Sequence, residues 1–117
     1  MRTQFRGVTA SVMDELTRSV LVVATGEQFA GVRRYLSSHG FNPVRVVIVG
    51  NFPEQDCDVV SLVVDKHLVR FDLARNGEVV SDPEIHTVKK FVVDTSQSRS
   101  FRSRVRAAES ILDALVA

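Results

Sequence analysis

The sequence contains little cysteine, no tryptophan and no long apolar run. Cys57 is the single cysteine of 117 residues, which excludes an intrachain disulfide and a zinc site built from several thiolates. A reduced, cytoplasmic environment is therefore expected. The longest uninterrupted apolar run, residues 20–24, is far shorter than the roughly 20 residues that span a bilayer, so no membrane association is expected.

Charge of one sign is not in excess either. The chain carries 15 basic and 14 acidic residues, a formal net charge of +1, so its overall field does not attract nucleic acid and any anion site must be local. Its length is that of one domain, and a hydrophobic content of 44% is enough to form an ordered core. We expect one compact domain over residues 1–117, with a frayed N-terminus at 1–7.

The N-terminal third supports two interpretations. Thr9 or Ser11 can cap a helix near residues 9–18. Residues 20–25 are rich in β-branched side chains and stop at Gly26, which is typical of a buried strand. The alternative is that the first helix continues to Gly26, because its apolar residues keep helical spacing. A further helix is predicted from Glu27, with Gly40 as its cap.

The rest of the chain contains mostly strand patterns. Residues 44–49 are almost wholly apolar, as in a strand covered on both faces. A meander is predicted over residues 59–64, 68–74 and 78–81, with a type I′ hairpin turn at Asn76-Gly77. Another strand is predicted at 87–94, and a last helix from about 99 to 115, capped by Ser96 or Ser98.

These elements follow the order α-β-α-β-β-β-β-β-α and predict an α+β fold. We expect a mixed or mainly antiparallel sheet of four to six strands, with about three helices packed on one side of it. If residues 20–25 are helical, the alternative is an N-terminal αα-hairpin followed by a β-meander and a C-terminal helix.

The start of the last helix is the best candidate for a binding site. Arg99, Arg102 and Arg106 lie near the positive end of the helix dipole, which favours anions. A phosphate or carboxylate held by these arginines and by Ser96 and Ser98 would relieve that conflict. The alternative is that the arginines pair with acidic side chains or are solvated.

The same helix has an apolar face wider than a short peripheral helix needs. Ile111, Leu115 and Val116 extend this face, and Arg104 falls inside it. We predict an interface here with a protein partner or a second copy of the chain. A large sheet beneath the helix, with Arg104 extending its charged end to water, would explain the pattern equally well.

No group of residues predicts catalysis, a metal or a cofactor. The acidic residues Glu54, Asp56 and Asp58 are interpreted as a solvated loop, and two of them flank Cys57, where they would raise the pKa of its thiol. The segment 26–31 lacks the lysine and hydroxyl residue of a phosphate-binding loop, so Gly31 is expected to serve a close helix contact.

The sequence thus favours a small non-enzymatic protein-binding or adaptor domain that self-associates through the C-terminal helix or a sheet edge. The alternative is an anion-binding regulator that uses the arginine face, with a phosphorylated ligand or, less favoured, a nucleic acid as its partner.

Overall fold

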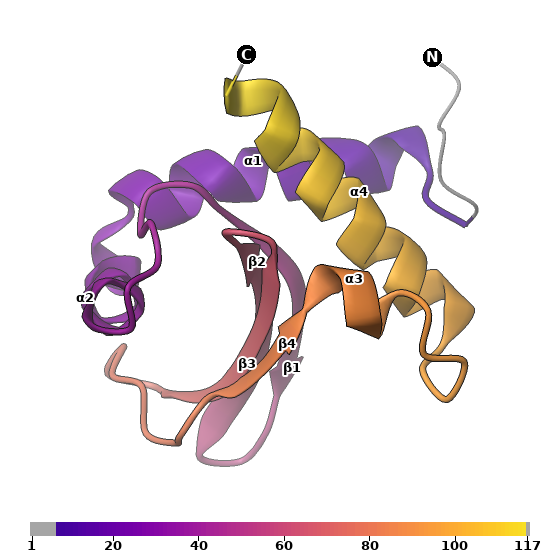
Figure 1. Ribbon diagram of the computed structural model, residues 1–117. Coiled ribbons are helices and arrows are strands. Elements are labelled where there is room, and N and C mark those ends of the chain that lie inside the picture. The colour runs from indigo at the N-terminus through magenta and orange to yellow at the C-terminus, as the bar shows by residue number, and fades with distance from the viewer. Residues whose placement is uncertain (1–6, 117) are drawn as a thin grey trace.

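The computed structural model describes residues 7–116, and it is an α+β domain (Figure 1). Of the terminus predicted to be frayed, residues 1–6 lie outside the described range. No helix within residues 7–116 is both long and apolar enough to cross a membrane. The elements in chain order are α1 (Ala10–Thr25), a 3₁₀ turn η1 (Glu27–Phe29), α2 (Ala30–Ser38), β1 (Val46–Pro53), β2 (Cys57–Val64), β3 (His67–Ala74), β4 (Glu84–Thr87), α3 (Val88–Phe91) and α4 (Arg99–Val116).

Residues 20–25 are helical, so the strand predicted there is wrong and the helical alternative is right. Thr9 caps α1, as predicted, by accepting a hydrogen bond from the Val12 N–H, and the helix continues to Thr25. Leu16 and Val23 are both fully buried on one face of α1. Because that helical face packs on the sheet, burial outweighs the β propensity of the segment. The two helices form no hairpin, since α1 crosses the view of Figure 1 whereas α2 is seen end-on.

Both ends of α2 are stabilised by specific hydrogen bonds. The Arg33 guanidinium reaches back to the end of α1 and donates to the carbonyls of Val23 and Gly26, both at 2.7 Å. Gly40 ends α2 with a φ of +82°, and the N–H of Phe41 donates to the Leu36 carbonyl at 2.9 Å. This is the glycine cap that the sequence predicts.

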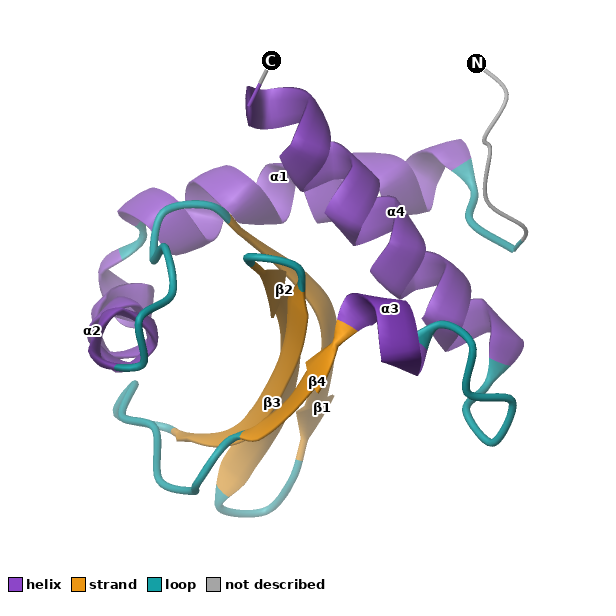
Figure 2. Cartoon of the chain, in the orientation of Figure 1, coloured by secondary structure: helices purple, strands orange, loops and turns teal. Residues whose placement is uncertain are grey.

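The four strands form one antiparallel meander in the order β1-β2-β3-β4, and the sheet is not closed (Figure 2). The mixed-sheet option is therefore excluded. The predicted type I′ turn at Asn76-Gly77 is wrong, because only Gly77 has a positive φ, of +87°. The two consecutive residues with positive φ are Asp65 and Lys66, between β2 and β3. The Asn76 Oδ1 instead accepts from the Glu78 N–H, which fixes a different turn.

Two of the predicted strands are changed. Residues 78–81 follow β3 but make only an isolated bridge, between Leu73 and Val79. The segment predicted as a strand at 87–94 holds the end of β4 and the helix α3, whose first turn is capped by the Thr87 hydroxyl. Val88 and Phe91 are 1% and 5% exposed, and only a helical turn places residues three apart on the same buried side.

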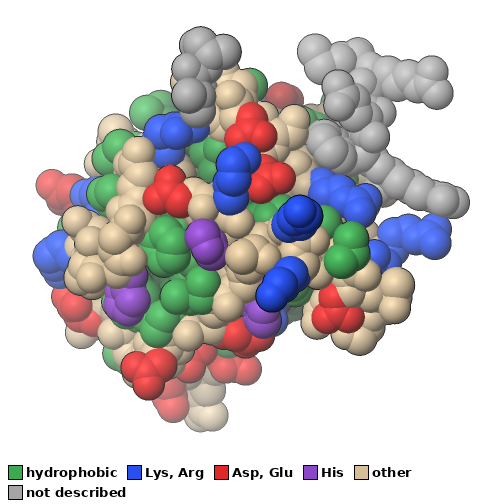
Figure 3. Space-filling view, in the orientation of Figure 1, with side chains coloured by type: hydrophobic (Ala, Val, Ile, Leu, Met, Phe, Trp, Pro, Cys, Tyr) green, Lys and Arg blue, Asp and Glu red, His purple; other side chains and the backbone are tan. Residues whose placement is uncertain are grey.

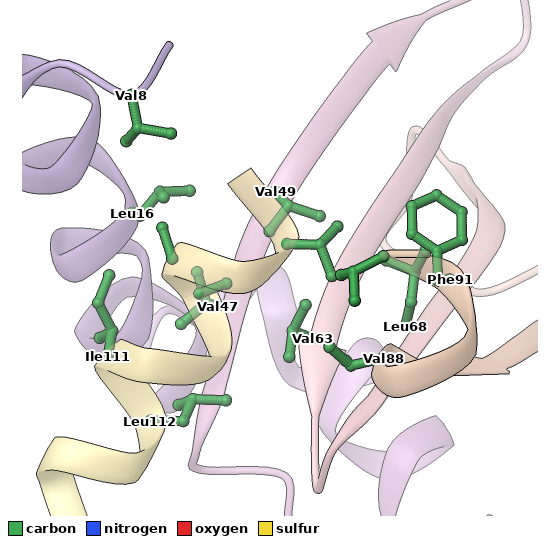
Figure 4. Packing of buried hydrophobic residues seen from close by; sticks show 14 residues of the cluster. Val8, Leu16, Val47, Val49, Val63, Leu68, Val88, Phe91, Ile111 and Leu112 are labelled. Atoms are coloured by element: carbon green, nitrogen blue, oxygen red, sulfur yellow. The ribbon is translucent and has the colours of Figure 1, made fainter. Parts of the chain in front are cut away.

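Helices cover both faces of the sheet, so the predicted one-sided packing is wrong. The buried hydrophobic residues form two core clusters, and successive residues of β1 belong to different ones. Val47 belongs to the cluster that includes α4, whereas Val46 belongs to the cluster that includes α2. Figure 4 shows the first cluster, with α4 over the strands, and Figure 1 shows α2 on the inner side of the curved sheet. Helix α1 serves both clusters, through Leu16 and Val23 respectively.

Gly31 holds α2 against the turn that follows β3, which confirms the predicted close contact. A Cβ atom at position 31 would lie 2.3 Å from the carbonyl oxygen of Gly77. Beside this contact Arg34 pairs with Glu78 at 3.2 Å. The absence of a side chain at Gly31 therefore sets the distance between α2 and this turn.

We expect Gly31→Ala to lower the free energy of unfolding by about 1–3 kcal/mol, because backbone atoms must move apart to admit the methyl group. Gly50→Ala is the control, since its Cβ would meet the Phe101 ring at an ordinary 3.4 Å. Urea unfolding of the two variants measures the difference. Equal stability of the two variants would contradict the close contact.

Candidate functional site

The serine hydroxyls of the predicted anion site are engaged within the protein. The Ser98 Oγ accepts from the Phe101 N–H at 3.1 Å and so caps α4, as the sequence predicts. The N–H and hydroxyl of Ser96 both donate to Asp94 Oδ1, at 3.0 and 2.7 Å. These hydrogen bonds are the main cause of the lowered pKa of Asp94, and the charge of Arg102 adds to it.

Two of the three arginines converge on one backbone carbonyl. Arg102 donates to the carbonyls of Gln97 at 3.2 Å and Val92 at 3.1 Å, and Arg106 donates to the Val92 carbonyl at 3.4 Å. Arg99 is exposed and has no ion pair within residues 7–116. The pair thus joins α4 to the chain that leaves α3, and the anion site stays a prediction.

Arg102→Met should lower the free energy of unfolding by roughly 1–2 kcal/mol, because two carbonyls lose a charged donor. Arg99 lies in the first turn of the same helix and is exposed, so Arg99→Met should change the free energy of unfolding by no more than about 0.5 kcal/mol. Thermal and urea unfolding of both variants test this. A stability unchanged by Arg102→Met would show that the Val92 contact contributes nothing.

The predicted C-terminal interface is largely turned inward. Arg104 donates from Nε to the Val49 carbonyl at 3.0 Å and lies 3.6 Å from Glu15. Ile111 is buried in the core, whereas Leu115 is 53% exposed. The side chain of Val116 lies outside the described ones. The strands and α1 beneath α4 therefore account for most of its wide apolar face, which is the alternative that the sequence left open.

At one edge of the sheet, the middle of β1 is blocked by side chains of both long helices. The Ile48 N–H, which points away from β2, donates to the Ser19 hydroxyl of α1 at 3.0 Å. The carbonyl of the following residue, Val49, lies at a bulge and accepts from Arg104 of α4. Pro53 ends the strand and has no N–H. Another strand cannot pair with residues 48–49 of this edge without displacing both contacts.

The opposite edge, that of β4, is open. The Val88 N–H donates to the Lys66 carbonyl at 3.0 Å, and hydrogen-bonding direction alternates along an antiparallel strand. The backbone groups of Glu84 and His86 therefore face β3, whereas those of Ile85 face away. Ile85 is 42% exposed, and the described residues place no hydrogen-bond partner on its outward groups. The sequence pointed to a sheet edge but could not show which one is free.

The acidic loop is tied to the neighbouring turn rather than arranged around an ion. Arg75 forms an ion pair with Asp58 and donates to the Glu54 carbonyl. Asp65 is used elsewhere, accepting from the Asn42 N–H at 2.7 Å. Over the described range, no three His, Cys, Asp or Glu side chains come together in a way that could hold a metal.

Cys57 stands in a setting that disfavours its thiolate. Partial burial raises the pKa of the thiol, and the charges of Asp72 and Glu54 raise it further. The sequence predicted this effect from the carboxylates that flank Cys57 in the chain. The charge that raises the thiol pKa most is instead that of Asp72, on the neighbouring strand β3.

We expect iodoacetamide to alkylate Cys57 at neutral pH more slowly than it alkylates Cys57 of the urea-unfolded chain, because only the thiolate reacts. Mass spectrometry over time gives both rates. A folded chain that reacts faster would contradict a raised thiol pKa.

Comparison of the chain with protein-family models, with curated protein sequences and with solved structures gave no match.

Proposed function

We propose that this chain is a non-enzymatic protein-binding domain that pairs, through the free edge of β4, with β4 of a second copy. The observation that carries the proposal is the contrast between the two edges. Ser19 and Arg104 occupy the Ile48 N–H and the Val49 carbonyl of β1, whereas the outward groups of Ile85 are free in the described structure. An exposed strand edge is a template for another strand.

The backbone of β4 fits its own copy in one register. With a two-fold axis at Ile85, the two Ile85 residues exchange both of their hydrogen bonds. The Thr87 N–H of each chain then meets the Pro83 carbonyl of the other. Pro83 has no N–H to satisfy, and the Thr87 carbonyl already accepts the first helical bond of α3. A register centred on His86 would pair Ile85 with Thr87, and its Ile85 N–H would need the Thr87 carbonyl that α3 already uses.

The side chains around β4 suit the same arrangement. Ile85, now 42% exposed, would face Ile85 of the second copy. Glu84 would face the second copy's His86, and within one chain these two side chains already lie 2.7 Å apart. That hydrogen bond is the main cause of the lowered pKa of Glu84.

This interface differs from the C-terminal helix, the other surface that the sequence suggested. Arg104 and Ile111 of that helix contact the chain's own sheet and core. A helix interface would leave only Leu115 as a described, exposed member of the predicted set. The free sheet edge is therefore the better supported surface for self-association.

Ile85→Pro is the sharpest test of this pairing. Proline removes only an outward-facing N–H, so the β3–β4 ladder should remain while the dimer loses its central hydrogen bonds. In analytical ultracentrifugation, we expect the wild type to shift from monomer to dimer between low micromolar and millimolar concentration, and Ile85→Pro to stay monomeric. Circular dichroism confirms that the variant is folded.

Ile85→Lys is a second variant that should prevent dimerisation, because two lysines would meet at the two-fold axis. Leu21→Lys on α1 is its control, since Leu21 is 67% exposed and does not belong to β4. The control should dimerise like the wild type. A wild type that stays monomeric at millimolar concentration, or a dimer that both Ile85 variants retain, would refute the proposal.

A further inference from the structure

An open groove lies between α3, the residues that follow it, α4 and the turn before β3. Its volume is about 990 Å³. It adjoins the end of β4 at Thr87, but Ile85, the centre of the pairing proposed above, does not line it. Figure 3 shows Lys and Arg side chains gathered on the face of the molecule that bears α3.

The groove is mainly apolar at its base. Val88 and Val92 line it from below and are 1% and 9% exposed, and Val93 beside them is 68% exposed. Val93 belongs to neither core cluster of the protein. A ligand seated here would therefore remove a large exposed side chain from water.

The rim is basic although the whole chain is nearly neutral. Lys89, Lys90 and Arg106 line the groove and have no acidic partner within 4.0 Å among the described residues. Lys66 also lines it and lies 3.6 Å from Asp113, and Glu109 is the acidic residue of the lining. The positive charge of this rim is therefore only partly offset.

We propose that this groove binds an acidic amphipathic segment of a protein partner. The segment's apolar side chains would cover Val92 and Val93, and its carboxylates would pair with Lys89, Lys90 and Arg106. Nucleic acid fits less well, because no Phe, Tyr or Trp lines the groove to stack on nucleobases, and a chain of phosphates would leave the apolar floor of the groove uncovered. The open shape also suits a chain segment better than an enclosed small molecule.

A displayed library of random short peptides, selected on the immobilised full chain, tests the proposal. We expect enriched peptides to combine net negative charge with apolar residues. A synthetic copy of the strongest binder should shift the amide NMR signals of residues 66–67, 87–93 and 106–109. Raising the salt concentration should weaken its binding.

Variants then place the peptide in the groove. Lys89→Glu with Lys90→Glu should weaken its binding about tenfold, because two rim charges are reversed. Arg18→Glu is the charge-reversal control, an exposed arginine of α1 outside the groove lining, and should bind as the wild type does. Val93→Ser should weaken binding, whereas Leu21→Ser, at nearly the same exposure of 67%, should not.

Three results would overturn the proposal: no enrichment, enriched peptides without an acidic bias, or binding that the lysine reversals leave unchanged. An oligonucleotide that competes for the same amide signals would assign the groove to nucleic acid instead. Ile85 does not line the groove, so Ile85→Pro should leave peptide binding unchanged while it abolishes the dimer, and the failure of each proposal can be recognised separately.

Discussion

The antiparallel sheet is apolar on both faces, and this constraint determines where every helix has to lie. Val46 and Val47 are neighbours on β1, yet both are fully buried, on opposite sides of the sheet. A sheet with two apolar faces needs cover on both. Helix α4 covers one face and α2 the other, while α1 is long enough to contribute to each cluster. The length of α1, and with it the helical state of residues 20–25, follows from this requirement.

The same packing leaves the two edges of the sheet unequal. Because α1 and α4 both lie over β1, a serine of one and an arginine of the other reach its backbone and block the middle of that edge. The chain then leaves β4 through the short helix α3, which packs on the face of the sheet and leaves the strand edge uncovered. The open edge and the groove beside α3 are thus consequences of how the core is covered.

The arginines of α4 show how one residue pattern can serve structure or binding. Their position near a helix N-terminus predicts an anion, yet Arg102 and Arg106 find a backbone acceptor in Val92. A carbonyl at the end of a preceding helical turn carries partial negative charge, and it meets part of the need that an anion would meet. Nothing local to residues 99–106 indicates this acceptor, because it is supplied by the chain that leaves α3.

The sequence by itself determined the α+β class, the cap at Gly40 and the close contact at Gly31, and it narrowed two further caps to Thr9 or Ser11 and Ser96 or Ser98, since each depends on a few neighbouring residues or on composition. The tertiary structure decided the helical state of residues 20–25, the end of the sheet at Thr87 and the inward role of Arg104. It also decided which sheet edge is free. These features depend on partners far away in the chain, such as Val49 for Arg104, and local pattern carries no information about such contacts.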